Sequence, residues 1–397
     1  MCESYASMTL GILEWLIIGG GVHGTHLSHV LATARGVPHD RIRVLDRESD
    51  PLAVFWRCAE AVGMAYLRSP GVHHLDLHPY SLLRFAQREG RRLEGRFMPP
   101  YDRPKLPLFR AHCDHVIRQH RLAELRLTAD TQTITSQPWG YRVETTAGYL
   151  DTRRLVLALG AGDRLGRPAW ARHGEPGWHV FHHAFTRTHI PAASTVAIIG
   201  GGISAAQLAL ALVRRGARPI VISRHPIREH RFDNDPAWLG PAAMQRFSRG
   251  GPVARREMIG HARHRGSMPP ELRRAVQRAV RSGLARWLDT EVTAIDRTDG
   301  EITLTLGRSL HLLTVAHIVL ATGFHRERPG GVLVDDAIET LGLPCAACGF
   351  PILRDTLEWR PNLYVTGALA ELELGPIARN IAGARAAGER LARVAGE

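Results

Sequence analysis

Lysine is almost absent from this sequence. Lys105 is the only lysine among 51 basic residues in a chain of 397, so nearly all of the positive charge is carried by arginine. A formal net charge of +13 would suggest a nucleic acid or an anionic membrane as partner. The arginines are spread along the whole chain, however, and no stretch interleaves basic and aromatic residues. We therefore expect neither nucleic acid nor a membrane as partner.

Cysteine is also scarce. The chain has five cysteines, an odd number and too few for the disulfide framework of a secreted protein, so we expect a reducing compartment. The first 15 residues lack a basic segment followed by an uninterrupted apolar run, and no later stretch is apolar for long enough to span a bilayer. These features predict a cytoplasmic protein.

Recognisable catalytic clusters are missing as well. The 22 histidines include no His-Glu-x-x-His sequence or other metal-ligand spacing, so we predict no metal site. No Ser-His-Asp arrangement and no carboxylate pair stands out either. The sequence therefore assigns no catalytic residue.

The strongest positive signal is a glycine-rich turn that follows the apolar run WLII. Gly19 permits a tight turn, Gly21 lets a diphosphate approach the backbone, and Gly24 lets the next helix pack on the strand. A second strand, RIRVLD, ends at Asp46, whose carboxylate can accept hydrogen bonds from both hydroxyls of an adenosine ribose. This order predicts a dinucleotide-binding site, with Arg47 beside the acid.

The same pattern recurs in the second half of the chain. TVAIIG leads into Gly200 and Gly202, Ser204 lies at the start of the next helix, and the strand PIVISR ends at Ser223 and Arg224. A carboxylate here would repel a 2′-phosphate, whereas a hydroxyl and a guanidinium can bind one. The second site is therefore expected to prefer NADPH over NADH, unless Arg224 is simply a solvated surface arginine.

These turns predict an α/β protein with two Rossmann-like dinucleotide-binding domains of the three-layer ββα type. Two apolar strands that end in glycine bracket the second domain, and a last strand, NLYVTG, precedes an amphipathic C-terminal helix expected from about Ile377. The first domain is thus discontinuous. The expected bounds are 1–165 and 324–397 for the first domain, 166–323 for the second, and about 225–285 for a small helical insertion that caps the second.

Three further segments carry a resemblance that covers nearly the whole chain. They are Trp56 through Asp76, with LRSPGVHHLD; Phe232 through Gly240, with FDNDPAWLG; and Gly367 through Arg385, with GALAELELGPIARNIAGAR. Together with the glycine turns, they resemble the FAD- and NAD(P)-binding class B flavin monooxygenase superfamily, particularly the lysine and ornithine N-hydroxylase branch and its shorter relatives. The FxGxxxHxxx(W/Y) fingerprint of Baeyer–Villiger enzymes is absent, which disfavours ketone oxidation.

The resemblance implies FAD in the first domain and NADPH in the second. It implies an oxidoreductase in which reduced flavin traps O₂ as a C4a-hydroperoxide and transfers oxygen to a nitrogen or sulfur atom of a small polar metabolite. Two alternatives stay open. One is an NADPH-dependent flavin reductase that passes electrons to a quinone, a thiol or a protein partner, and the other is a flavin-binding sensor or RNA-associated protein. A homo-oligomeric state stays open too.

A reductase that acts through thiols needs two cysteines that reach the flavin. Cys58 stands alone in the first region, and residues 192–320 contain no cysteine. Cys345 and Cys348 have the spacing of a redox motif, but a structural or coincidental pair is the simpler interpretation.

The resemblance also implies candidate residues around the flavin. Trp56 is a candidate to pack on the flavin or the nicotinamide. The LRSPGVHHLD segment is expected to pass the flavin, so four of its side chains are candidates for binding substrate or the ring: Arg68, Ser69, His73 and His74.

The C-terminal segment supplies the remaining candidates. Gly367 lies where disulfide reductases have a Gly-Asp pair, so the ribityl hydroxyls need other partners. Gly375 and Pro376 precede the final helix, whose N-terminus is expected to point positive potential at the N1/O2 edge of the isoalloxazine. Asn380, on the expected first turn, would add a hydrogen bond.

Overall fold

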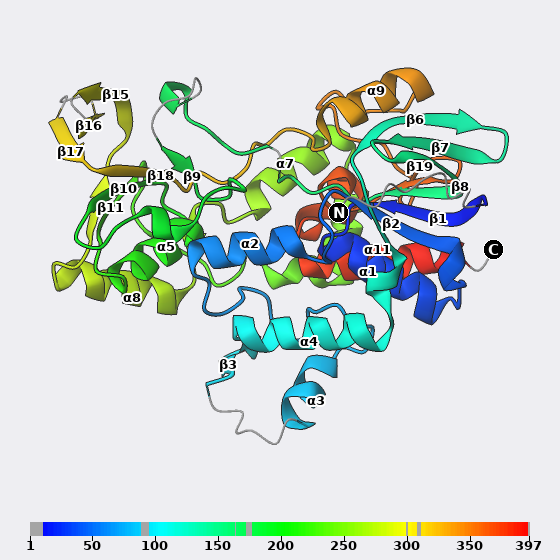
Figure 1. Ribbon diagram of the computed structural model, residues 1–397, viewed down its shortest axis with the longest axis horizontal. Helices are drawn as coiled ribbons and strands as arrows, with labels where there is room; N and C mark the ends of the chain where they lie inside the picture. The colour runs from blue at the N-terminus through cyan, green and yellow to red at the C-terminus, as the bar shows by residue number, and fades with distance from the viewer. Residues whose placement is uncertain are drawn as a thin grey trace.

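The computed structural model describes residues 11–88, 95–162, 164–171, 177–298, 301–307 and 311–395. Two lobes lie side by side, each built on its own β-sheet (Figure 1). Both ends of the described chain belong to the same lobe. None of the described helices is long and apolar enough to cross a membrane.

The first lobe has an eight-stranded sheet with strands from both ends of the chain. Its main path is β19-β20-β8-β1-β2-β5, and β1 pairs in parallel with both β2 and β8. A hairpin of β6 and β7 extends from β8. The strands are β1 (Leu13–Ile18), β2 (Ile42–Asp46), β5 (Arg126–Thr128), β6 (Thr131–Gln137), β7 (Gly140–Thr145), β8 (Gly148–Leu157), β19 (Glu358–Arg360) and β20 (Leu363–Val365).

The two faces of this sheet are covered differently. Because side chains alternate along a strand, Trp15 and Ile17 of β1 face a cluster with helices α1, α4 and α11, whereas Leu16 and Ile18 face the β6–β7 hairpin and α9. This hairpin–sheet–helix order is the expected three-layer ββα arrangement. The helices of the lobe are α1 (Val22–His29), α2 (Ala53–Val62), α3 (Ser81–Arg88), α4 (Leu106–Gln119), α9 (Gly331–Leu341), α10 (Glu371–Leu374) and α11 (Ile381–Val394).

The second lobe has a five-stranded parallel sheet in the order β14-β11-β10-β18-β9. A three-stranded antiparallel sheet of β15, β16 and β17 packs on one face, and α5 (Ile203–Val213) lies on the other. The α/β class with two Rossmann-like folds is confirmed. The strands are β9 (Trp178–His179), β10 (Thr195–Ile199), β11 (Arg218–Ser223), β14 (Arg286–Asp289), β15 (Val292–Thr298), β16 (Glu301–Leu306), β17 (His311–Val315) and β18 (His317–Leu320).

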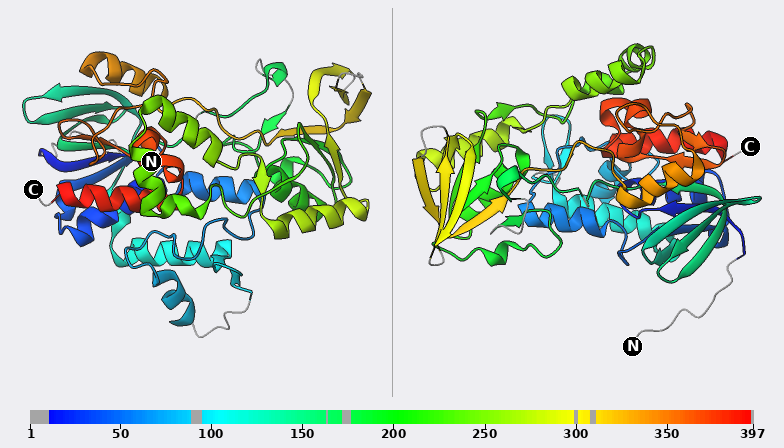
Figure 2. Two further views of the ribbon diagram at one scale, coloured as in Figure 1. Left: turned by 180° about the vertical axis from the view of Figure 1, so that it is seen from behind. Right: turned by 90° about the horizontal axis from the view of Figure 1, so that it is seen from above.

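The segment between β11 and β14 is largely helical, but it does not only cap the second lobe. It contains α6 (Pro241–Ser248), α7 (Pro252–Ala262), α8 (Pro270–Arg281) and the short strands β12 (Arg228–Glu229) and β13 (Ser267–Met268). Helix α8 contacts α5, whereas Phe247 of α6 and Ile259 of α7 pack against Phe350 and Leu372 of the first lobe. The insertion therefore joins the two lobes, as Figure 2 shows from behind and from above.

The C-terminal helix begins later than the sequence predicted. A short 3₁₀ turn, Gly375–Ile377, precedes it, and α11 starts at Ile381 with Asn380 as its N-cap. The Asn380 side chain accepts a hydrogen bond from the Gly383 N–H at 3.0 Å. Asparagine satisfies an otherwise unpaired N–H best from the cap position, which explains the shift.

The two glycine turns lie where the strand order of each sheet reverses. In each sheet the central strand has the next strands of the chain on one side: β2 and β5 beside β1, and β11 and β14 beside β10. The other side holds β8, β20 and β19 in the first sheet and β18 and β9 in the second, so the loop after each central strand is the topological switch point. Gly19 has φ +108°, and a Cβ on Gly24 would lie 1.8 Å from the Gly19 carbonyl oxygen. The turn therefore requires glycine at position 24 for packing.

Replacing Gly24 with alanine should destabilise the protein by at least about 2 kcal/mol, because the new methyl group must displace a backbone carbonyl. Gly21→Ala is the matched control, since a Cβ at Gly21 would meet nothing within 4 Å. Urea unfolding should show a lower midpoint for the first variant alone. Equal midpoints would contradict the packing role of Gly24.

The first lobe also buries several histidines. Burial lowers the pKa of His26 and His74 to about 3 and that of His112 to about 4. His112 Nε2 lies 2.9 Å from the hydroxyl of Ser81, and its ring packs edge-on against His74 with centroids 4.9 Å apart. These rings are therefore neutral in the folded protein at pH 7.

Stability should fall as the pH drops from about 6.5 towards 4. In this pH window these histidines bind protons in the unfolded chain but stay unprotonated in the folded protein. The free energy of unfolding therefore rises with pH. Urea unfolding between pH 7.5 and 5 measures the slope. His112→Asn should reduce that slope, while His311→Asn, at an exposed position, should not. An unchanged slope in the first variant would contradict the account.

Candidate functional site

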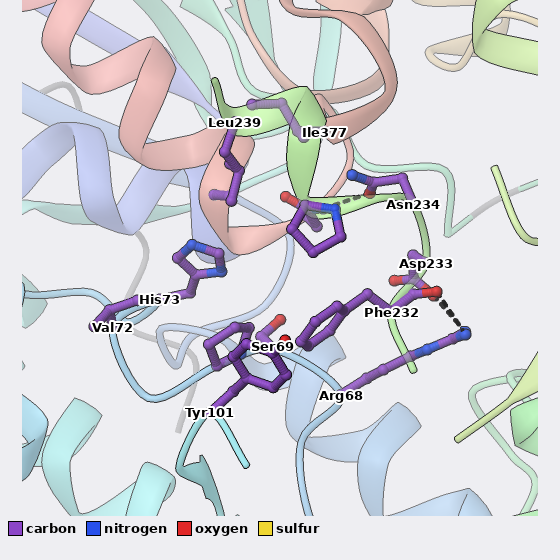
Figure 3. Close-up of a pocket in the computed structure, with 14 residues that line it drawn as sticks. Arg68, Ser69, Val72, His73, Tyr101, Phe232, Asp233, Asn234, Leu239 and Ile377 are labelled. Atoms are coloured by element: carbon purple, nitrogen blue, oxygen red, sulfur yellow. Dashed lines mark hydrogen bonds and ion pairs between the residues drawn. The ribbon is translucent and has the colours of Figure 1, made fainter. Parts of the chain in front are cut away.

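A pocket of about 220 Å³ opens between the first lobe and the insertion (Figure 3). Three chain segments that are far apart in sequence line it: 68–73 after α2, 232–239 of the insertion, and 377–382 at the start of α11. Tyr101 adds an aromatic wall, and its ring packs edge-on against Phe232 with centroids 5.1 Å apart. The pocket thus combines apolar walls with a few polar side chains, as ligand sites do.

The first glycine turn has open space where a diphosphate would approach. A Cβ on Gly21 would meet no atom within 4 Å, and Gly21 is the N-cap of α1, whose first N–H groups point outward. Asp46 lies beside the turn, and its carboxylate accepts hydrogen bonds from the N–H groups of Gly20 and Glu48. These residues fit an adenine dinucleotide.

His23, inside this turn, has an unused nitrogen. Its Nδ1 lies 2.8 Å from the hydroxyl of Thr366, while the buried Nε2 has no hydrogen-bond partner among the described residues. Burial lowers the pKa of His23 to about 4, although the nearby Asn380 main chain partly opposes this. The neutral ring lies against Gly367 and beside the main chain of Asn380, a residue that lines the pocket.

Arg126 is a site residue that the sequence analysis missed. Its guanidinium lies 4.0 Å from the Asp46 carboxylate and donates to the carbonyls of Glu48 and Ser49. A Cβ on Gly20 would lie 1.8 Å from it. Arg126 starts a strand some 80 residues after Asp46, and only the parallel pairing of β2 with β5 brings the two together.

Three of the predicted residues line the pocket with free or partly free polar groups. Ser69, His73 and Asn380 are all among its lining residues. Burial, with a smaller contribution from the charge of Arg385, lowers the pKa of His73 to about 4, so this ring is neutral. The Asn380 amide lies 3.4 Å from the side-chain oxygen of Asn234 across the pocket.

Arg68 lines the pocket and makes several hydrogen bonds to the protein. It pairs with Asp233 at 2.7 Å and donates to the carbonyls of His230, Arg231 and Phe232 and to the hydroxyl of Ser267. Because these bonds use its donors, Arg68 holds the insertion against the 68–73 segment. Its candidate role in binding substrate or the flavin ring stays a prediction, since Arg68 also lines the pocket.

Two other predicted residues are not among those that line the pocket. His74 is fully buried, with Nε2 3.1 Å from the Pro79 carbonyl. Trp56 lies in the core of the first lobe, where it packs against Phe55 and Phe109. In both cases the helix or turn geometry directs the side chain inward, which a sequence segment alone does not reveal.

The remaining predicted residues of the first lobe surround the site. Gly367 has φ +67° and follows β20. Gly375, with φ +71°, and Pro376 are buried below the start of α11, and Gly375 faces Met244 of the insertion. Arg47 is exposed and pairs with Asp130 at 3.4 Å.

The second glycine turn is more enclosed than the first. Gly200 has φ +134°, and Ser204 lies in the first turn of α5, but a Cβ on Gly202 would lie 3.4 Å from the Cα of Gly266. A loop of the insertion therefore covers one side of this turn.

The end of β11 presents one of its two predicted groups outward. The Ser223 hydroxyl is buried and donates to the carbonyl of His225 at 2.7 Å, so it is already engaged. Arg224 is exposed. A 2′-phosphate at this edge would therefore meet the guanidinium.

No cysteine is among the pocket-lining residues that the structure describes. Cys345 and Cys348 are free thiols in the loop after α9, and burial raises the pKa of the Cys345 thiol. Burial also raises the pKa of Cys58, to about 11. Within the described ranges, no group of three or more potential ligands is arranged to hold a metal ion.

Comparisons with known proteins agree with this architecture. Two family models, both described as pyridine nucleotide-disulphide oxidoreductase, match residues 111–263 and 194–350. No curated protein sequence matches the chain.

Solved structures with the same fold cover nearly the whole chain. The FAD-bound cadaverine monooxygenase of Erwinia amylovora is 18% identical, with a TM-score of 0.76 over 97% of this chain and 94% of its own. The ornithine hydroxylase of Pseudomonas aeruginosa is also 18% identical, with a TM-score of 0.76 over 97% and 99%. The bacillithiol disulfide reductase of Staphylococcus aureus is 16% identical, with a TM-score of 0.64 over 96% and 97%.

The expected resemblance is thus confirmed at the level of the fold. This chain is similar in sequence to pyridine nucleotide-disulphide oxidoreductases across residues 111–350, and it has the two-dinucleotide-binding fold that flavin-dependent N-hydroxylating monooxygenases share with flavin disulfide reductases.

Proposed function

We propose that this chain is an FAD-dependent, NADPH-consuming monooxygenase that oxygenates a nitrogen or sulfur atom of a small polar metabolite. The observation that carries the proposal is the position of the pocket. Asn380, which lines it, has its main chain beside His23 of the first glycine turn, and no described thiol lines it. A flavin held there would face O₂ and substrate, not a redox-active cysteine pair.

The residues of the first lobe would hold FAD. Gly21 and the N-terminus of α1 would bind the diphosphate, Asp46 the adenosine ribose, and His23 Nε2 an oxygen of the ribityl–diphosphate part. When bound, FAD would accept reducing equivalents from the nicotinamide and react with O₂. On this proposal, residues 1–165 and 324–397 form the FAD domain and 166–323 the NADPH domain, with Arg224 selecting the 2′-phosphate.

The pocket residues would position and shield the reacting atoms. The N-terminus of α11, capped by Asn380, directs positive potential into the pocket and would stabilise negative charge on a reduced ring. His73 is neutral, so it can exchange a hydrogen bond without adding charge. The rings of Tyr101 and Phe232 would exclude water.

Oxygenation predicts incorporation of one atom of O₂ into product. Purified protein with FAD should consume NADPH in air, and ¹⁸O₂ should label a hydroxylamine or sulfoxide formed from a panel of small amines, thiols and thioethers. Anaerobic turnover with a quinone or disulfide as acceptor, with label only in peroxide or water, would contradict oxygenation.

The likeness to a bacillithiol disulfide reductase makes thiol chemistry the second candidate. The double variant Cys345→Ser and Cys348→Ser separates the two functions. If the protein is a monooxygenase, the rate of oxygenation in this variant should equal that of the native protein, because neither residue lines the pocket. Loss of turnover there would support the reductase.

His23→Ala should weaken FAD binding by about tenfold, the effect of one lost hydrogen bond at a shielded site. Fluorescence titration of the FAD-free protein measures this constant. His23→Gln, which keeps an amide near the position of the ring, should recover part of the affinity. Thermal unfolding without FAD checks the fold of both variants. FAD affinity equal to that of the native protein would contradict the assignment.

A further inference from the structure

A second cavity adjoins the pocket on the side of Tyr101. Its volume is also about 220 Å³, and it is lined by the segment 70–72, by helix α3 and by the turn at residues 101–102. Pro70, Val72 and Tyr101 line both cavities. The two cavities therefore share one wall, and a ligand in the first pocket lies next to the second cavity.

The lining of the second cavity is apolar. Leu83 of α3 and Phe97 are half-buried there, and Val72, Tyr80 and Tyr101 are exposed although they are large apolar or aromatic residues. A group of such residues in contact with water is typical of a surface that a ligand covers. An apolar cavity of about 150 Å³ is enough to bind benzene, so the second cavity has room for a ring or a short alkyl chain.

The charges around the second cavity disfavour an acidic ligand group. Asp102 is the carboxylate among the described residues that line it, and no arginine, lysine or histidine is among them. A carboxylate or phosphate that entered would lose hydration without meeting a positive group. A hydrocarbon group has no such cost, so it is the ligand group that fits this cavity.

The backbone places Tyr101 in the shared wall at a conformational cost. Tyr101 has φ +75° and Asp102 has φ +46°, so two successive residues adopt the left-handed region that favours glycine. Gly71 holds them there, because its N–H donates to the Tyr101 carbonyl at 3.2 Å and a Cβ on it would lie 2.6 Å from the Asp102 carbonyl oxygen. The Tyr101 ring is exposed, so burial in a core does not explain this cost. The ring instead lines both cavities and packs edge-on against Phe232 (Figure 3).

We propose that the second cavity binds an uncharged hydrocarbon group, a ring or a short alkyl chain, of the substrate whose nitrogen or sulfur atom lies in the first pocket. This inference rests on the proposed function and specifies its substrate class as an amine or thioether with an apolar substituent. Burial of the substituent between Leu83, Phe97 and Tyr101 supplies binding energy at a distance from the reacting atom.

The test uses the full-length protein with FAD and without NADPH, and its probes are alkyl methyl sulfides, which are uncharged at every pH. In calorimetric titrations, pentyl methyl sulfide should bind at least about tenfold more tightly than dimethyl sulfide, since each buried methylene adds roughly a factor of four. Leu83→Trp fills the second cavity and should remove most of this preference. Arg84→Trp is the matched control, because it places the same ring on the next residue of α3, which is exposed and lines neither cavity.

A second variant keeps the test decisive if Leu83→Trp does not fold. Tyr80→Asp introduces a charge at an exposed position of the same cavity, and it should also reduce the preference for pentyl methyl sulfide. Thermal unfolding checks the fold of each variant. The cavity assignment would be overturned if the native protein showed no preference, or if the folded variants at positions 83 and 80 kept the native preference.

The proposed function is decided by a separate measurement on the same probes. With NADPH and ¹⁸O₂, labelled sulfoxide should form from pentyl methyl sulfide. If the chain-length preference is present but no product of any substrate carries label, oxygenation is refuted and the cavity assignment stands. If labelled sulfoxide forms but the preference is absent, oxygenation stands and the cavity assignment is refuted.

Discussion

The first lobe depends on one steric constraint, the contact between the carbonyl oxygen of Gly19 and the Cα of Gly24. Only glycine at position 24 lets α1 begin directly against the end of β1. Because β1 is the central strand of the sheet, this contact fixes the helix N-terminus at the switch point. The open backbone of Gly21, the ring of His23 and the carboxylate of Asp46 then lie at one edge of the sheet, where a dinucleotide fits.

The features that depend on local backbone geometry could be predicted from the sequence. The turns at Gly19 and Gly200 follow from glycine spacing between a strand and a helix, so the α/β class could be predicted. Side-chain direction could not be. Trp56 and His74 turn inward because of tertiary packing, and His23 gains its significance from Thr366, which lies 343 positions away in the sequence. The sequence feature that could have pointed to His23 is its position inside a glycine turn.

Several arginines of this fold donate hydrogen bonds to main-chain carbonyls of loops, a role that the abundance of arginine alone does not reveal. Arg68 binds three successive main-chain carbonyls of the insertion, Arg126 binds carbonyls beside the first turn, and Arg385 binds those of residues 74, 76 and 77. A planar guanidinium has five donors and can satisfy several loop carbonyls at once, which a lysine ammonium does less well. Part of the positive charge therefore connects loops around the pocket.

The charges around the pocket bear on which form of a substrate can react. Asp233 is the carboxylate among the described lining residues, and Arg68 already neutralises it at 2.7 Å, while His73 is neutral. A protonated amine would lose hydration there without gaining a counter-charge, whereas a neutral amine or thioether enters at lower cost and keeps the lone pair that accepts oxygen. On the proposed function, the rate of oxygenation should therefore follow the neutral fraction of the substrate.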